Sequence, residues 1–152
     1  MDHLVYCDKK ASVLNKLLSG EKTKIIRGAS GRKLPYGRVF KGEKLYFVET
    51  DGTSIIRATA IVKSVFNSEV LSFDESKQII YSMQNELKLT GEQQKRWIGK
   101  KRLCIIEVEN VQPIDHEMIY DRQDNMDDWI TVSNIHDILA GSSKVYQSIR
   151  IK

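Results

Sequence analysis

The chain has 152 residues, of which 41% are hydrophobic and 29% charged, and its formal net charge is +4. This length and composition fit one globular domain that can bury its own core, and they exclude an intrinsically disordered chain. Cys7 and Cys104 form no CxxC pair, which argues against a disulfide framework or a zinc ribbon and favours the reducing cytoplasm. No apolar run reaches the roughly 20 residues of a membrane span, so we expect no membrane association.

The first 20 residues predict a strand followed by a helix. Residues 3–6 read as a short strand, and Asp8 is expected to be the N-cap of a helix that reaches about Leu18. Apolar residues recur at helical spacing within this stretch, which predicts one buried face. Gly20 suits the left-handed residue with which many helices end.

The next segment predicts a set of strands separated by short turns. Ile25 and Ile26 predict an extended stretch over residues 24–27, and the glycine, serine and proline content of residues 28–37 predicts a loop. The expected strands and turns that follow are a strand at 38–40, a turn at 41–43, a strand at 45–48, a tight hairpin turn at Asp51-Gly52 and a return strand at 55–66. The length of the return strand predicts a bend or a bulge.

Helical signals dominate from residue 72 to residue 98. Ser72 opens a helical region, and Thr90-Gly91-Glu92-Gln93 matches a capping box that should start a further short helix. A strand is predicted over residues 103–111, followed by an irregular acidic stretch from 115 to 128. The remaining expected elements are a short helix capped by Ser133 or Asn134 and ended by Gly141, and a final strand over 145–151.

Charge is distributed unevenly along the chain. Eight bases lie between Lys22 and Lys44 against the single acid Glu43, and a second basic cluster comprises Lys95, Arg96, Lys100, Lys101 and Arg102. Between residues 107 and 128 the balance reverses and acids predominate. The sequence therefore predicts a basic body with an acidic late segment.

Gly20, Lys22 and Arg27 lie in the run Gly-x-Lys-x-x-Ile-x-Arg, at the junction between the predicted helix and the next strand. Together with the loop, the Lys-Gly-Glu turn and the long return strand, this run resembles the ASCH family of the PUA-like superfamily, whose signature is Gly-x-Lys-x-x-Glu-x-Arg. Ile25 stands where the family has its Glu. The resemblance implies an α+β fold, a small mixed PUA-like β-barrel with two or three flanking helices, over residues 1–111. Residues 112–152 are then a C-terminal extension packing on the barrel.

The resemblance also implies a basic cleft, because many PUA-like modules hold RNA or a modified base beside this segment. Arginine offers a two-pronged donor to phosphate and lysine offers a point charge, whereas the plain alternative is that these bases only keep the surface soluble. We therefore expect an RNA- or nucleotide-binding module. The expected binding residues are Lys22, Lys24, Arg27, Arg32, Lys33, Tyr36 and Arg38.

Hydrolysis is the alternative that the resemblance leaves open. A few ASCH members remove the acetyl group from N4-acetylcytidine, and others are reported or suspected to cut RNA. The amidohydrolases carry a Lys at the motif Lys, a Thr three residues later and a Glu from the later helical region. Lys22 matches the first, Glu86 or Glu92 could supply the carboxylate, and Ile25 lacks the hydroxyl of the nucleophile. The pattern thus favours binding over chemistry, with Lys22 and Glu86 as the catalytic alternative.

Other side chains carry weaker expectations. Tyr46 and Phe47 are adjacent on one strand, so one of them should face outward, and Trp97 fits either the core or a ligand platform. The three histidines are isolated and are expected at the surface, and the acidic residues lack calcium-loop spacing. We therefore expect no metal and no cofactor. The acidic segment 115–128 could pack on the basic cleft or bind a protein partner.

Overall fold

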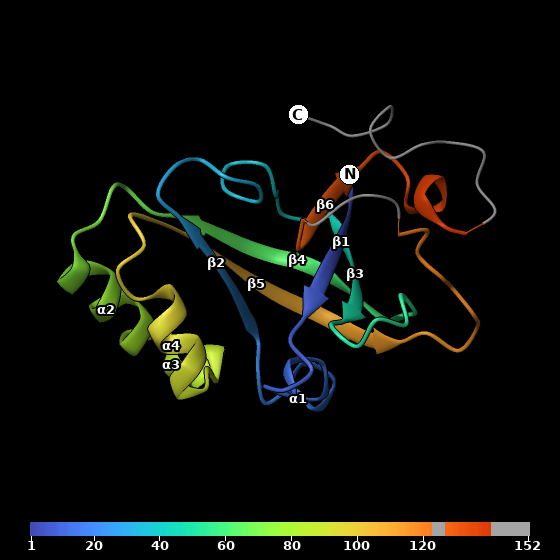
Figure 1. Ribbon diagram of the computed structural model, residues 1–152, viewed down its shortest axis with the longest axis horizontal. Coiled ribbons are helices and arrows are strands. Elements are labelled where there is room, and N and C mark those ends of the chain that lie inside the picture. The colour runs from blue at the N-terminus through green and yellow to red at the C-terminus, as the bar shows by residue number, and fades with distance from the viewer. Residues whose placement is uncertain (123–126, 141–152) are drawn as a thin grey trace.

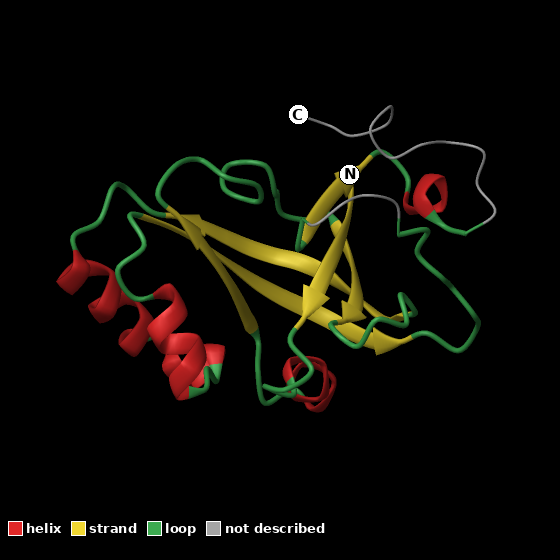
Figure 2. Cartoon of the chain, in the orientation of Figure 1, coloured by secondary structure: helices red, strands yellow, loops and turns green. Residues whose placement is uncertain are grey.

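The computed structural model describes residues 1–122 and 127–140, which form a mixed β-sheet flanked by short helices (Figures 1 and 2). The strands are β1 (Asp2–Cys7), β2 (Lys24–Ala29), β3 (Lys44–Glu49), β4 (Ile56–Asn67), β5 (Arg102–Pro113) and β6 (Trp129–Val132). They lie in the order β2-β5-β4-β3-β1-β6 and curl into a half-barrel. β1 and β3 run parallel, and the other neighbouring pairs are antiparallel. The predicted α+β fold class is confirmed.

The two longest strands, β4 and β5, give the sheet its curvature. Their pairing shifts register between Thr59 and Ile61 and again between Val62 and Ser64. Another shift lies between Phe47 and Val48, where β3 pairs with β4. Irregularities of this kind bend a strand and increase its twist, so the predicted bend in the return strand is confirmed.

The helix α1 (Val13–Ser19) covers one face of the sheet. Its Leu14 and Leu17 pack in a buried cluster with Ile25, Phe47 and Val108, which come from three different strands. Gly20 ends the helix in the left-handed conformation, with a φ of 81°, as predicted. The chain then enters β2, so the end of α1 fixes where the Lys22–Arg27 segment begins.

An insert of three short helices lies between β4 and β5 and sits beside β2 (Figure 1). The helices are α2 (Phe73–Ser82), α3 (Gln84–Leu87) and α4 (Gly91–Trp97). Ser72 and Thr90 begin α2 and α4 with capping boxes, in which side chain and backbone bond reciprocally. Leu87 and Trp97 pack in a buried cluster with Ile26 of β2. This packing holds α4 next to the strand that carries Arg27.

The chain after β5 returns to the sheet and places β6 beside β1, where Ile130 lies opposite Leu4. A third buried cluster joins the two parts of the chain, made of Leu4, Tyr46, Val48 and Ile56 with Met118, Tyr120, Ile130, Val132, Ile135 and Ile138. Tyr46 is therefore buried here while its neighbour Phe47 is buried on the other face. The prediction that one of the two faces solvent was wrong, because the returning chain covers the outer face.

His3 is completely buried, so its predicted surface position was also wrong. Its Nδ1 accepts a hydrogen bond from the Trp129 indole N–H at 3.1 Å and lies 2.9 Å from the Thr131 hydroxyl. Because indole can only donate, Nδ1 is the unprotonated nitrogen, and Nε2–H donates to the Glu43 carboxylate at 2.9 Å. The histidine therefore ties β6 to β1 and to the turn before β3. His116 and His136 are exposed, as expected.

Three local predictions need correction. α1 begins only at Val13, because the Asp8 carboxylate accepts from the Lys10 backbone N–H in a turn that precedes the helix. Residues 38–40 form no strand, because only Val39 reaches the core and Phe40 remains 62% exposed. The turn at Asp51 is a longer loop, in which the aspartate accepts hydrogen bonds from the backbone N–H and the hydroxyl of Thr53.

The C-terminal predictions divide between described and undescribed residues. A short 3-10 helix, η1 (Ile135–Ile138), follows β6, and the Asn134 side chain caps it by accepting from the His136 backbone N–H. The predicted end at Gly141 and the predicted strand over 145–151 lie outside the described residues. The strand β6 had not been predicted.

Candidate functional site

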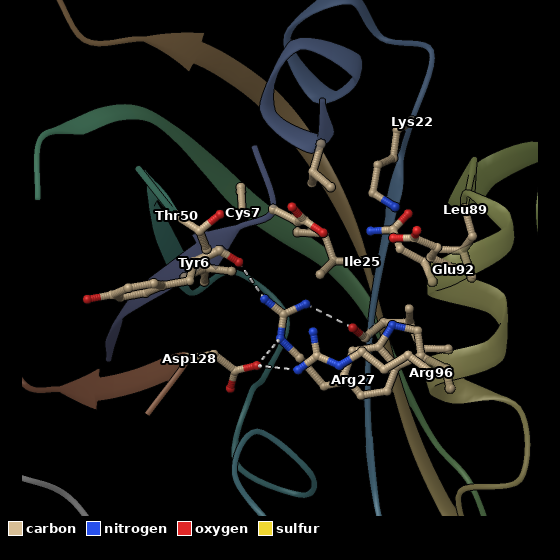
Figure 3. Close-up of a pocket in the computed structure, with 16 residues that line it drawn as sticks. Tyr6, Cys7, Lys22, Ile25, Arg27, Thr50, Leu89, Glu92, Arg96 and Asp128 are labelled. Atoms are coloured by element: carbon tan, nitrogen blue, oxygen red, sulfur yellow. Dashed lines mark hydrogen bonds and ion pairs between the residues drawn. The ribbon is translucent and has the colours of Figure 1, made fainter. Parts of the chain in front are cut away.

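A cavity of about 460 Å³, named here the central cavity, opens between β1, β2 and α4 (Figure 3). Its apolar wall is formed by Val5, Val13, Ile25, Ile26, Leu89 and Trp97. Its polar lining consists of Tyr6, Cys7, Asp8, Lys22, Arg27, Thr50, Glu92, Gln93, Arg96 and Asp128. Small-molecule sites in proteins occupy roughly 300–1,000 Å³ and combine apolar walls with a few convergent polar groups. The central cavity has this construction.

Lys22 reaches this cavity as a nearly buried amine. The residue is 3% exposed, and its Nζ donates a hydrogen bond to the Leu87 carbonyl at the end of α3. Its backbone is fixed by a bond from the Lys22 N–H to the Lys16 carbonyl of α1. Burial, and then the charge of Arg27, lower the pKa of Lys22 from its ordinary 10.5 to about 7. Near neutral pH the amine therefore exists in both protonation states and can donate or accept hydrogen bonds.

Arg27 is held in place by β1 and by its own strand. Its guanidinium donates to the Tyr6 carbonyl at 2.7 Å and to the Ile26 carbonyl at 2.9 Å. Its Nε lies 3.3 Å from the Asp128 carboxylate, and its planar group lies 5.6 Å from the centre of the Trp129 ring. Burial lowers the pKa of Arg27 and Asp128 opposes this, yet a guanidinium stays charged in proteins. The result is a rigid cation at the cavity wall.

The helix α4 supplies the opposite wall. Trp97 is buried and packs in the core, while Arg96 lies over its ring at 4.4 Å and remains 61% exposed at the cavity mouth. The Arg96 Nη2 is 3.8 Å from the same Asp128 carboxylate that Arg27 contacts. An anionic group therefore already sits between two guanidiniums. The acidic segment reaches the basic cleft through Asp128, as Figure 3 shows.

Ile25 lies in the apolar wall and is 2% exposed, so the position of the family Glu presents neither a carboxylate nor a hydroxyl. Of the two carboxylates considered for chemistry, Glu92 lines the central cavity and Glu86 does not. The Glu86 Oε2 is buried with no hydrogen-bond partner among the described residues, and its backbone carbonyl accepts from Thr23. A hydroxyl also lines the cavity, that of Thr50, which accepts from the Lys9 backbone N–H.

A second cavity, of about 160 Å³, adjoins the first one. Both cavities are lined by Arg27, Arg96, Trp97 and Asp128. The second cavity is also lined by Lys33 and Tyr36 of the loop and by Lys100 and Arg102. The remaining bases of the predicted binding set line neither cavity. Lys24 lies opposite Glu107 on β5, and Arg32 and Arg38 are exposed on the loop after β2.

Several lining residues were absent from the predicted binding set: Tyr6, Arg96, Lys100, Arg102 and Asp128. A signal existed for three of them, because Arg96, Lys100 and Arg102 belong to the second basic cluster of the sequence. Pairing that cluster with the first one would have required knowing that β2 and β5 are neighbours in the sheet. Tyr6 carries no comparable pattern, whereas Asp128 ends the acidic segment 115–128, for which packing on the basic cleft was one of the two expectations.

Within residues 1–122 and 127–140, no three His, Cys, Asp or Glu side chains gather closely enough to hold a metal ion. In the same residues, no helix has the length and apolar character that crossing a membrane requires.

Comparison with known proteins identifies structures with a similar fold but no match by sequence. No protein-family model matches the chain, and no curated protein matches it by sequence. Among solved structures, ASCH from Zymomonas mobilis matches with a TM-score of 0.57 and 14% identity, over 74% of this chain and 70% of that one. A tyrosine-to-phenylalanine mutant of the same protein matches with a TM-score of 0.57 and 14% identity, over 76% and 73%. The chain therefore has an ASCH-like fold, as the sequence predicts.

Proposed function

We propose that the protein binds RNA or a nucleotide in the central cavity. The observation that carries the proposal is the shared carboxylate, because Arg27 and Arg96 approach Asp128 at 3.3 and 3.8 Å and leave an anion-sized position between them. Guanidiniums form strong charge-assisted hydrogen bonds with phosphate oxygens as well as with carboxylates. A nucleotide phosphate that enters the mouth would exchange with Asp128, whose side chain is 35% exposed.

The inner part of the cavity suits a nucleobase. Ile25, Ile26 and Leu89 offer an apolar surface for the flat face of the base, and Lys22 offers one polar contact at depth. Because the amine is partly uncharged near neutral pH, it can accept a hydrogen bond from a base N–H or donate one to a base carbonyl. In this proposal the guanidiniums at the mouth of the cavity bind the phosphate, and the apolar wall and Lys22 bind the base in its interior.

Titration of the protein with each ribonucleoside 5′-monophosphate at low salt, followed by amide chemical shifts, tests the proposal. We expect shifts concentrated on β2 and α4, with weaker binding in Lys22→Met and Arg96→Ala. A matched control is Lys95→Ala, which removes an exposed cation from the same helix as Arg96. The proposal fails if neither nucleotides nor single-stranded RNA bind at low salt.

Hydrolysis of an acylated nucleoside or of single-stranded RNA is the second candidate, and one observation favours it. An amine with a pKa of about 7 suits general-base chemistry, and the Glu92 carboxylate lines the same cavity. Ile25 is apolar and has no hydroxyl to act as the nucleophile. In this scheme the nucleophile is therefore a water molecule. Incubation with N4-acetylcytidine and with single-stranded RNA decides: product formation that Lys22→Met abolishes supports hydrolysis, and no turnover excludes it.

A further inference from the structure

The second cavity carries an excess of positive charge that the fold itself does not neutralise. Among the residues that the structure describes, five cations line it, Arg27, Lys33, Arg96, Lys100 and Arg102, against one carboxylate, Asp128. That carboxylate is already engaged with Arg27 and Arg96. Lys33, Lys100 and Arg102 form no ion pair with any residue that the structure describes. Like charges gathered in a recess repel one another and attract an anion.

Two of these cations are positioned by the fold. Arg102 lies over the Tyr36 ring at 5.5 Å, with its Nη1 3.5 Å from the Tyr36 hydroxyl, and that hydroxyl donates to the Ser68 carbonyl. Tyr36 is thus a support for Arg102. The stem of Lys100 lies against Gly28, where an added Cβ would come within 3.1 Å of the Lys100 Cβ and Cγ. Side chains that are held before binding lose less conformational freedom when a ligand arrives.

The β3 side of the central cavity has a more acidic lining than the second cavity. A third cavity, of about 210 Å³, shares Tyr6, Thr50 and Asp128 with the central one. Among the described residues, its lining contains the carboxylates Glu49, Asp127 and Asp128 and the cation Arg122. Glu49 pairs with Arg57 at 3.5 Å, and Asp128 pairs with Arg27 and Arg96. Phosphate groups are therefore attracted more strongly on the β5 side of the central cavity than on the β3 side.

We propose that the second cavity is a phosphate-binding subsite, and that the ligand is the terminal nucleotide of a single-stranded RNA whose backbone leaves the central cavity across Lys100 and Arg102. The inference rests on the proposed function and adds to it the class of ligand and the direction of the strand. An unpaired end suits the site because a base must leave its stack to enter a recess, which single strands allow at little cost. Among the described residues, the third cavity offers a backbone one cation, Arg122, against five in the second cavity, so the second cavity is the more favourable exit.

Fluorescence anisotropy with a labelled single-stranded 20-nucleotide RNA, together with calorimetric titration of the four ribonucleosides, tests the subsite. In the double variant Lys100→Gln/Arg102→Gln we expect about tenfold weaker RNA binding at moderate salt and unchanged nucleoside binding. The slope of log affinity against log salt should become shallower by about 1.4, because each phosphate contact with a single strand contributes about 0.7. Lys63→Gln, an exposed cation on β4, is the matched control and should leave both measurements unchanged.

The outcomes separate the subsite from the proposed function. Failure of the unaltered protein to bind any probe overturns the proposed function, and with it the subsite. Binding by the unaltered protein that the double variant leaves intact, or that it weakens equally for nucleosides and RNA, overturns the subsite alone. A circularised RNA of the same sequence tests the terminal nucleotide: we expect it to bind at least tenfold more weakly than the linear strand, and equal affinity overturns end recognition.

Discussion

Lys22→Met tests whether the buried amine costs the protein stability near neutral pH. Methionine keeps an unbranched side chain in the wall of the central cavity and removes the titrating group. In the folded protein the pKa of Lys22 is about 7, against an ordinary value of 10.5. A base whose pKa is lowered on folding binds fewer protons folded than unfolded, so its penalty is full below pH 7 and disappears as the pH rises towards 10.5.

The size of this penalty follows from the shift. One pKa unit corresponds to about 1.4 kcal/mol, so at pH 7, where half of the folded amines are charged, the penalty is about 4 kcal/mol. The substitution also leaves the buried Leu87 carbonyl without its partner, which costs roughly 1–3 kcal/mol. We therefore expect Lys22→Met to be more stable than the unaltered protein at pH 7 by on the order of 2 kcal/mol. By about pH 10 the variant should be the less stable protein by about 1 kcal/mol, because the penalty has fallen to about 1 kcal/mol while the unpaired carbonyl still costs about 2 kcal/mol.

Thermal unfolding followed by circular dichroism between about pH 6 and pH 10 measures the effect. For a domain of this size, 2 kcal/mol corresponds to a Tm difference of about 4–8 °C at pH 7. The titratable groups that both proteins contain change Tm with pH in the same way, so their effect cancels in the Tm difference between the two proteins. Lys63→Met, at an exposed position on β4, is the control and should show no trend with pH. A Lys22→Met difference that stays constant across the range would refute the buried, partly neutral amine.

Three further predictions concern the frame around the site. Burial lowers the pKa of His3, so the folded protein binds a proton there less readily than the unfolded chain does. The free energy of unfolding should therefore be unaffected by His3 above about pH 6.5 and should fall as the pH drops below that value. His3→Gln should flatten this part of a curve of Tm against pH. Trp129→Phe removes the indole donor to His3 and should cost about 1–2 kcal/mol in urea unfolding, whereas no loss would contradict the buried network. Gly28→Ala places a Cβ 2.9 Å from the buried Leu103 side chain and 3.1 Å from Lys100, so we expect a loss of about 1–3 kcal/mol; an unchanged midpoint would count against this packing.

The frame of the sheet could be predicted because its signals are local. Alternating or continuous apolar runs marked β3, β4 and β5, and Gly20 marked the end of α1. Ser72 marked the start of the helical region of α2, and a capping box marked α4. The strand β6 escaped because its four residues are all buried and carry no alternation. Its place in the sheet depends on pairing with β1 at the other end of the chain, which no local pattern records.

Only the part of the candidate site that lies in one local run could be predicted from the sequence. Lys22 and Arg27 lie in one local run, so the sequence places both at the junction between the helix α1 and the strand β2. Arg96 and Asp128 join them only because α4 packs on β2 and the returning chain reaches Arg27. Burial of His3 escaped similarly, because its partners Trp129 and Thr131 come from β6. Long-range pairing therefore determines which side chains complete the site.

The most direct test of RNA binding is a salt series with a labelled single-stranded RNA on the unaltered protein, Arg96→Ala and Lys95→Ala. Arg96 is exposed at the mouth of the central cavity, so its removal should leave the fold intact, and Lys95 matches it in helix and charge. We predict an affinity that falls steeply with salt, and a loss of about tenfold in Arg96→Ala that Lys95→Ala does not share. Equal affinities in all three proteins, or no binding at low salt, would contradict a nucleic-acid site in this cavity.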